Sequence, residues 1–104
     1  MQKNQNSRLY DAIPQLGRLR DEVLYGDVWK QPEMGARDRS LVTCAVLAAL
    51  GRRDELEHHM RVAVENGVTR DELRGLVVQV GFYAGWPAAV GAGKAGLALF
   101  EDEG

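Results

Sequence analysis

Two adjacent histidines, His58 and His59, are the residues of this chain best suited to proton transfer. Imidazole titrates near neutral pH, so it can donate or accept a proton during catalysis. On a helix, His59 shares a face with Leu56 and Ala63, whereas His58 shares one with Asp54. We therefore expect His58 to be solvated. We expect His59 to face the interior, either as a hydrogen-bonded core residue or as a proton donor in a pocket.

Arg37 and Arg39 are the candidate anion-binding residues, and both lie in the segment RDRSLVT at residues 37–43. Positive side chains in the first turn of a helix face an unfavourable dipole, so another group should hold them there. An ion pair with Glu33, with Asp27 or with a neighbouring subunit is one interpretation. The other is carboxylate binding, because an arginine and the free N–H groups of a helix N-terminus both favour an anion.

An aromatic cluster precedes Pro87 in the segment FYAGWP and comprises Phe82, Tyr83 and Trp86. Such residues at a bend between two helices can form a packing hinge. A rigid aromatic corner can also wall a small-molecule pocket. Tyr83 and Trp86 are therefore candidate substrate-binding residues.

Cys44 is the only cysteine of the chain, which excludes an internal disulfide and a CxxC redox pair. Its neighbours are apolar, so we expect a small core residue with a slow thiol. A lone cysteine fits a reducing compartment such as the cytoplasm. The acidic residues are dispersed, so we expect no metal site and no metal cofactor.

Residues that typically start or end helices recur along the sequence, and this pattern predicts an all-α domain. The clearest signal is a capping box in which Thr69 and Glu72 bond each other's backbone N–H groups. Asn66-Gly67 is typical of a helix C-terminus, and Pro87 fits the first turn of the helix that follows. The expected helices, five in all, cover residues 13–25, 36–50, 54–66, 70–84 and 87–100.

Composition limits the chain to one domain, because 104 residues with 45% hydrophobic content bury a single modest core. We expect a polar segment at residues 1–12 and the domain at residues 13–104. A net charge of −2 without runs of like charge argues against nucleic acid, and no segment suits a membrane span or a secretory signal. The helix at residues 36–50 is apolar all round, which predicts a homo-oligomer.

Several linked motifs resemble the carboxymuconolactone decarboxylase-like family over most of the chain. They are YGDVW at residues 25–29, RDRSLVT at 37–43, ALGRRDELEHH at 49–59, AVENGVTRDEL at 63–73 and FYAGWPAAV at 82–90. The resemblance implies the helical alkylhydroperoxidase D-like fold, assembled as trimers or hexamers. It also identifies His59, rather than His58, as the family histidine.

Two departures from the family pattern narrow the chemistry that the resemblance implies. The peroxidase branch has CxxC before the histidine, and here those positions hold Arg52 and Glu55, so disulfide peroxidase chemistry is not expected. Gly75 stands where relatives commonly have an acid, so any role of that acid is lost.

The resemblance implies decarboxylation of a small unsaturated lactone that carries a carboxylate, without a cofactor. Arg37 or Arg39 would bind a carboxylate of this small-molecule substrate, and His59 would protonate the resulting enolate as a general acid. One fold hosts several chemistries. Two alternatives therefore remain: another small-molecule enzyme of the same fold, such as an oxidoreductase, and a non-catalytic oligomeric binding protein.

Overall fold

The computed structural model describes residues 4–102, which form helices joined by short turns, with no strand among them. The chain divides after Gly35 into two compact units. The all-α prediction is therefore confirmed. Within the described residues there are seven α-helices, two more than the sequence predicted.

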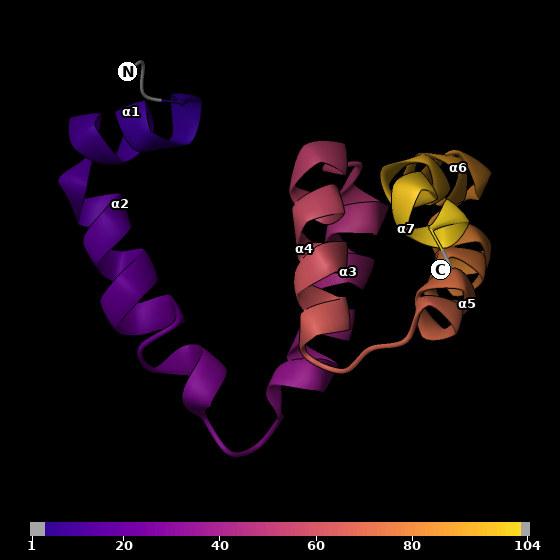
Figure 1. Ribbon diagram of the computed structural model, residues 1–104, viewed down its shortest axis with the longest axis horizontal. Coiled ribbons are helices and arrows are strands. Elements are labelled where there is room, and N and C mark those ends of the chain that lie inside the picture. The colour runs from indigo at the N-terminus through magenta and orange to yellow at the C-terminus, as the bar shows by residue number, and fades with distance from the viewer. Residues whose placement is uncertain (1–3, 103–104) are drawn as a thin grey trace. The chain divides into compact units, whose positions relative to one another are not determined.

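The first unit contains two short α-helices, α1 (Gln5–Ala12) and α2 (Pro14–Leu19), at the indigo end of the ribbon in Figure 1. A π-helical turn, Arg20–Leu24, continues α2, and a 3-10 turn, Val28–Lys30, follows. The predicted helix over residues 13–25 corresponds to α2 and the π-helical turn. The predicted polar segment 1–12 contains α1, and its residues 1–3 lie outside the described residues.

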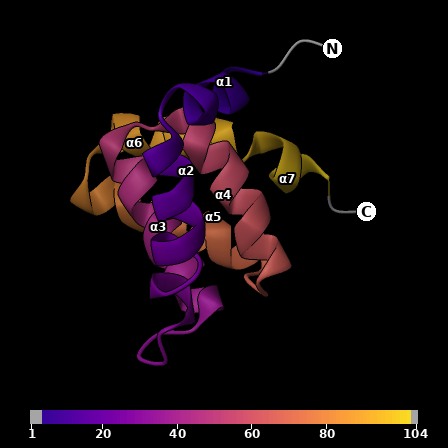
Figure 2. The same cartoon turned by 90° about the vertical axis from the view of Figure 1, so that its left-hand side faces the viewer.

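The second unit contains α3 (Ala36–Leu50), α4 (Arg53–Glu65), α5 (Arg70–Tyr83), α6 (Trp86–Ala95) and α7 (Leu97–Glu101). In it α3 and α4 form an antiparallel hairpin, visible side by side in Figure 1 and from a second direction in Figure 2. Helix α6 packs against α3, α4 and α5. Arg70 and Arg74 tie α7 to α5 by donating to the carbonyl oxygens of Leu99 and Phe100, each at 3.0 Å.

Glycines with positive φ end α3, α4 and α5 where the sequence predicted helix ends. Gly51, Gly67 and Gly85 have φ values of 72°, 100° and 107°. This region of φ costs glycine little and other residues considerably more. The capping box at the start of α5 is also confirmed, with Thr69 Oγ1 accepting from the Glu72 N–H at 3.0 Å.

The core of the second unit lies between α3, α4, α5 and α6. Leu56, Met60 and Leu73 are its largest fully buried side chains, and Cys44 and Ala63 fill the space between them. Burying one such leucine or methionine contributes roughly 1.5–3 kcal/mol relative to leaving it exposed. No helix of the described residues is long and apolar enough to cross a membrane.

The prediction of one continuous helix over residues 87–100 is wrong. Helix α6 ends and α7 begins at Gly96, which is buried against the side chains of Met60 and Phe100. A Cβ atom at Gly96 would lie 2.7 Å from the Phe100 ring and 2.8 Å from the Met60 sulfur. A side chain at this position would therefore force Met60 or Phe100 to shift, and glycine avoids that cost.

Candidate functional site

His59 lies at the end of the second turn of α4, on the helix face that also carries the buried residues Leu56 and Ala63. Its side chain is half-buried, and its Nδ1 atom is buried without a hydrogen-bond partner among the described residues. Buried polar atoms almost always have a partner. The Nδ1 atom of His59 is therefore available to a water molecule or a ligand.

His58 is exposed, as the sequence predicted, and its ring meets that of His59 edge to face. The ring centroids are 5.2 Å apart. Burial lowers the pKa of His59 below its usual value of 6.5, and a charge on His58 lowers it further. His59 is consequently neutral at pH 7 unless a bound anion favours its protonated form.

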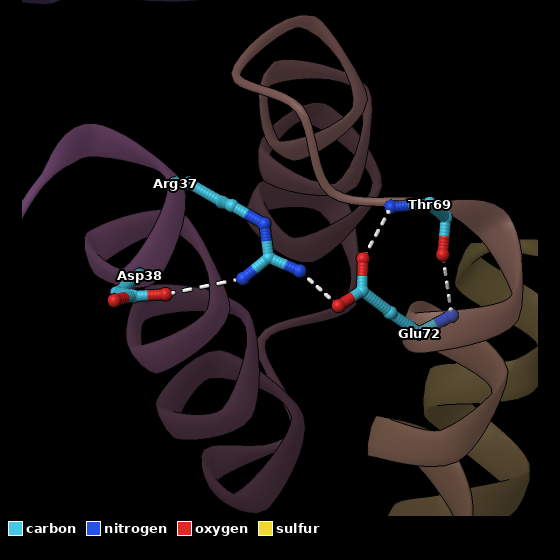
Figure 3. Close-up of polar contacts among 4 residues, drawn as sticks. All are labelled: Arg37, Asp38, Thr69 and Glu72. Carbon is cyan, nitrogen blue, oxygen red and sulfur yellow. Dashed lines mark hydrogen bonds and ion pairs between the residues drawn. The ribbon is translucent and has the colours of Figure 1, made fainter.

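Arg37 is the second residue of α3, and its guanidinium forms an ion pair with Glu72 of α5, as Figure 3 shows. It also donates to Asp38 at 3.2 Å. The Glu72 carboxylate in turn accepts from the Thr69 N–H at 2.9 Å, so one acid serves the capping box and the ion pair together. The Thr69 N–H and Arg37 lower the pKa of Glu72, and Glu72 raises that of Arg37.

This ion pair supplies the group that the sequence required to hold Arg37 against the helix dipole. The partner is Glu72, 35 residues away in sequence, rather than Glu33 or Asp27. Any carboxylate ligand at Arg37 must compete with Glu72 for the guanidinium.

Arg39 is half-buried two residues further along α3, and its carbonyl oxygen accepts from Thr43 Oγ1 at 2.8 Å. Ser40, next to it, is almost completely buried and accepts from the Asn66 side-chain amide at 2.9 Å. This bond fixes the register of the α3–α4 hairpin. Because His59 precedes Asn66 by two helical turns, it lies about 10 Å along α4 from this end of the hairpin.

Tyr83 and Trp86 lie at the junction of α5 and α6 and are 84% and 67% exposed. Trp86 and Phe82 line an apolar groove of about 180 Å³ together with Val78 and Val90. Tyr83 does not line this groove, and neither does His59. The structure thus places the aromatic candidates at a surface groove and does not bring them together with the histidine.

Cys44 has no exposed surface, in agreement with its prediction as a small core residue. Burial raises the pKa of its thiol to about 11. A protonated, enclosed thiol is a poor nucleophile and a poor metal ligand. Among residues 4–102, no three His, Cys, Asp or Glu side chains come together to hold a metal ion.

These features define a small all-α protein with an ionisable histidine on a core-facing helix surface and arginines at helix N-termini. The model of the carboxymuconolactone decarboxylase family matches residues 14–97, so the chain belongs to that family. This match confirms the family resemblance predicted from the five sequence motifs.

Two relatives of this chain are named as decarboxylases. The 4-carboxymuconolactone decarboxylase of Acinetobacter baylyi is 48% identical over 80 residues, covering 77% of this chain and 60% of the relative. The nitrosuccinic acid decarboxylase npaB of Metarhizium robertsii is 35% identical over 71 residues, covering 68% of this chain and 50% of the relative. The chain therefore spans between half and three-fifths of the length of these relatives.

Proposed function

We propose that this chain is a cofactor-independent decarboxylase that acts on a small carboxylated lactone of the 4-carboxymuconolactone type. Both relatives described above are named as decarboxylases of small carboxylic acids, which supports the reaction class. The structural observation that carries the proposal is His59, a half-buried imidazole whose Nδ1 lacks a hydrogen-bond partner among the described residues. Such a group can hold and transfer a single proton.

The reaction needs one proton and a place for one electron pair. The bond between the lactone carbon and its carboxylate breaks, CO₂ leaves, and the electron pair enters the conjugated lactone as an extended enolate. His59, in its protonated form, then gives a proton to the enolate carbon, and solvent restores the proton on the imidazole. The substrate's negative charge favours this protonated form, because a nearby anion raises the pKa of a histidine.

The proposed reaction also needs residues that bind the substrate carboxylate and residues that exclude water, and we assign these roles to arginines and to aromatic residues. Arg39 or Arg37 binds a substrate carboxylate, and binding at Arg37 requires release of Glu72. Tyr83 and Trp86 lie apart from His59 within one subunit, so in this proposal they exclude water from the histidine of a neighbouring subunit. Exclusion of water strengthens every charge interaction with the developing enolate.

The proposed working form is a cytoplasmic homo-oligomer, a trimer or a hexamer. Val42, Val46 and Leu50 form a stripe on α3 that the other helices of its unit leave at least half exposed. Residues four apart share one helix face, so the stripe is continuous. The buried thiol of Cys44 is compatible with a reducing compartment.

The test is a turnover assay of the purified protein with 4-carboxymuconolactone, following both loss of its absorbance and release of CO₂. His59→Ala should lower kcat by roughly 10²–10⁴-fold, the usual contribution of a general acid. His58→Ala is the matched control and should retain turnover, because His58 is exposed. Equal losses in the two variants, both folded, would remove His59 from the mechanism. No turnover by the unmodified protein would reject the substrate.

A further inference from the structure

A cavity of about 100 Å³ lies where the end of α3, the start of α4 and the start of α6 meet. Leu47, Leu56 and Pro87 give it an apolar interior, while Arg52 and Arg53 supply its charged groups. A single water molecule needs about 10–15 Å³ of such space. The cavity therefore has room for several waters or for part of a small organic molecule.

Arg52 and Arg53 differ from many of the other arginines in having no ion-pair partner. Five arginines of the described residues pair with carboxylates, and these are Arg18, Arg20, Arg37, Arg61 and Arg74. Within residues 4–102, no acid lies within ion-pair distance of Arg52 or Arg53, although Asp54 and Glu55 follow them directly. Two unpaired guanidinium groups beside an apolar cavity match a ligand with a carboxylate head and an apolar body.

The local backbone leaves both arginine side chains available to such a ligand. Arg52 is the N-cap residue of α4, and its side chain makes no capping hydrogen bond. Both arginines are exposed, so their charges stay solvated until a ligand enters. The first N–H groups of α4 favour an anion at this position, whereas the carboxylates of Asp54 and Glu55 in the same turn oppose it, so the two arginines must supply the attraction.

The cavity and His59 are neighbours on α4. Leu56 lines the cavity, and His59 follows it by three residues, a spacing that places two side chains side by side on one helix face. His59 does not itself line the cavity, so a molecule held by its carboxylate at the start of α4 must extend beyond Leu56 to reach the imidazole. The 4-carboxymuconolactone type of substrate carries two carboxylates, of which one is lost and one remains.

We propose that Arg52 and Arg53 bind the retained carboxylate of a small organic dicarboxylate whose carbon skeleton enters this cavity. As an account of substrate binding, the inference rests on the proposed function. In this account Arg52 and Arg53 take the carboxylate-binding role that the proposed function gave to Arg39 or Arg37. They are positioning residues, because the carboxylate that they hold does not react. The site should discriminate strongly against uncharged analogues, which leave both guanidinium groups without their partner.

The binding test uses calorimetric titration of the whole protein with cis,cis-muconate, a six-carbon unsaturated dicarboxylate with no ring carboxylate to lose. Arg52→Gln and Arg53→Gln should each raise the Kd roughly tenfold, as expected for loss of a charged hydrogen bond. Arg61→Gln removes a charge from an exposed position of the same helix and should leave the Kd unchanged. The diamide of muconate should show no binding.

Turnover of 4-carboxymuconolactone separates this inference from the proposed function. If the unmodified protein turns over the lactone, the two variants should raise KM with little change in kcat. If the unmodified protein turns over the lactone but both arginine variants still bind muconate with unchanged Kd, the carboxylate site is overturned. The proposed decarboxylase activity would then stand without it. Arginine-dependent muconate binding without turnover would support the site and reject the decarboxylase. If Arg61→Gln raises the Kd for muconate as much as the other two variants do, the effect comes from net charge alone, and the proposed site is overturned.

Discussion

The buried Nδ1 atom of His59 is the residue-scale feature on which the proposed chemistry depends most directly. A buried polar atom without a partner costs roughly 1–3 kcal/mol of folding free energy. Such local costs are typical of functional positions, where other parts of the fold offset them. A ligand or water that bonds this nitrogen would recover part of the cost on binding.

The pH dependence of turnover follows from the lowered pKa of His59. A general acid must be protonated, so kcat/KM should be greatest below this pKa and should fall as pH rises through it. Because burial lowers the pKa, the fall should begin below pH 6.5. Initial rates at limiting lactone concentration between pH 5 and pH 8 measure it. A kcat/KM that rises over this range would make His59 a base instead.

The requirement for a protonated His59 also predicts how kcat depends on pH, and this dependence should differ from that of kcat/KM. Substrate anions in the complex favour the imidazolium, so the decline of kcat should lie at higher pH than that of kcat/KM. His58→Ala should shift the kcat/KM profile towards higher pH, since a charge on His58 is the second cause of the lowered pKa. An unshifted profile would show that His58 does not contribute to the lowered pKa of His59.

Cys44 permits a residue-scale test of the redox alternative. Its thiol is enclosed and its pKa is raised to about 11, so iodoacetamide should label the native protein far more slowly than the urea-unfolded protein. Cys44→Ala should keep turnover and lower the free energy of unfolding by roughly 1 kcal/mol through lost packing. Activity loss in a folded Cys44→Ala variant would favour redox chemistry.

The sequence was sufficient to distinguish His58 from His59, because helical spacing alone assigns each residue to a face. It was not sufficient to find the partner of Arg37, since Glu72 becomes its neighbour only when α3 and α5 pack together. The cavity beside Arg52 and Arg53 was missed for the same reason, as three helices contribute to it. The sequence feature that could have indicated this site is the pair of consecutive arginines directly after Gly51.

At the scale of elements, helix ends were more predictable than helix interruptions. The ends depend on local chemistry, such as the Thr69–Glu72 capping box and the positive φ of Gly85. Gly96, where α6 gives way to α7, packs against Met60, and this contact between residues distant in sequence is not visible in the local pattern. Helix α1 was missed because its polar sequence lacks a strong apolar stripe, although Asn4 caps it by accepting from the Ser7 N–H at 2.7 Å.

Two glycines in helical segments should respond oppositely to alanine. A Cβ atom at Gly75 meets nothing within 4 Å, so Gly75→Ala should raise the free energy of unfolding by roughly 0.5–1 kcal/mol through helix propensity. Gly96→Ala should lower it by roughly 1–3 kcal/mol, because the new atom collides with Met60 and Phe100. Urea unfolding of both variants measures the contrast. If the two substitutions change the free energy of unfolding by the same amount, the close packing of α4 at Gly96 is contradicted.

At the scale of the whole molecule, exposed apolar surface is the dominant feature. Among residues 4–35 of the first unit none is fully buried, and Leu9, Leu16, Leu19 and Val23 line an open apolar groove there. The second unit exposes the α3 stripe and the Phe82–Trp86 groove. Isolated exposed leucines are common on proteins, but contiguous apolar patches mark interaction surfaces.

The proposed homo-oligomer predicts how the α3 stripe responds to charge. Val46 lies at its centre and is 50% exposed, so Val46→Glu should place a carboxylate inside a subunit interface and dissociate the assembly. Glu65→Gln is a control on an exposed residue of α4 outside the stripe. Light scattering at micromolar concentration should give a multiple of 11.5 kDa for the unmodified protein and for the control. A monomeric mass for the unmodified protein would reject the oligomer. An intact assembly in a folded Val46→Glu variant would move the interface away from α3 to another exposed apolar surface, such as the groove at Trp86 or the groove in the first unit.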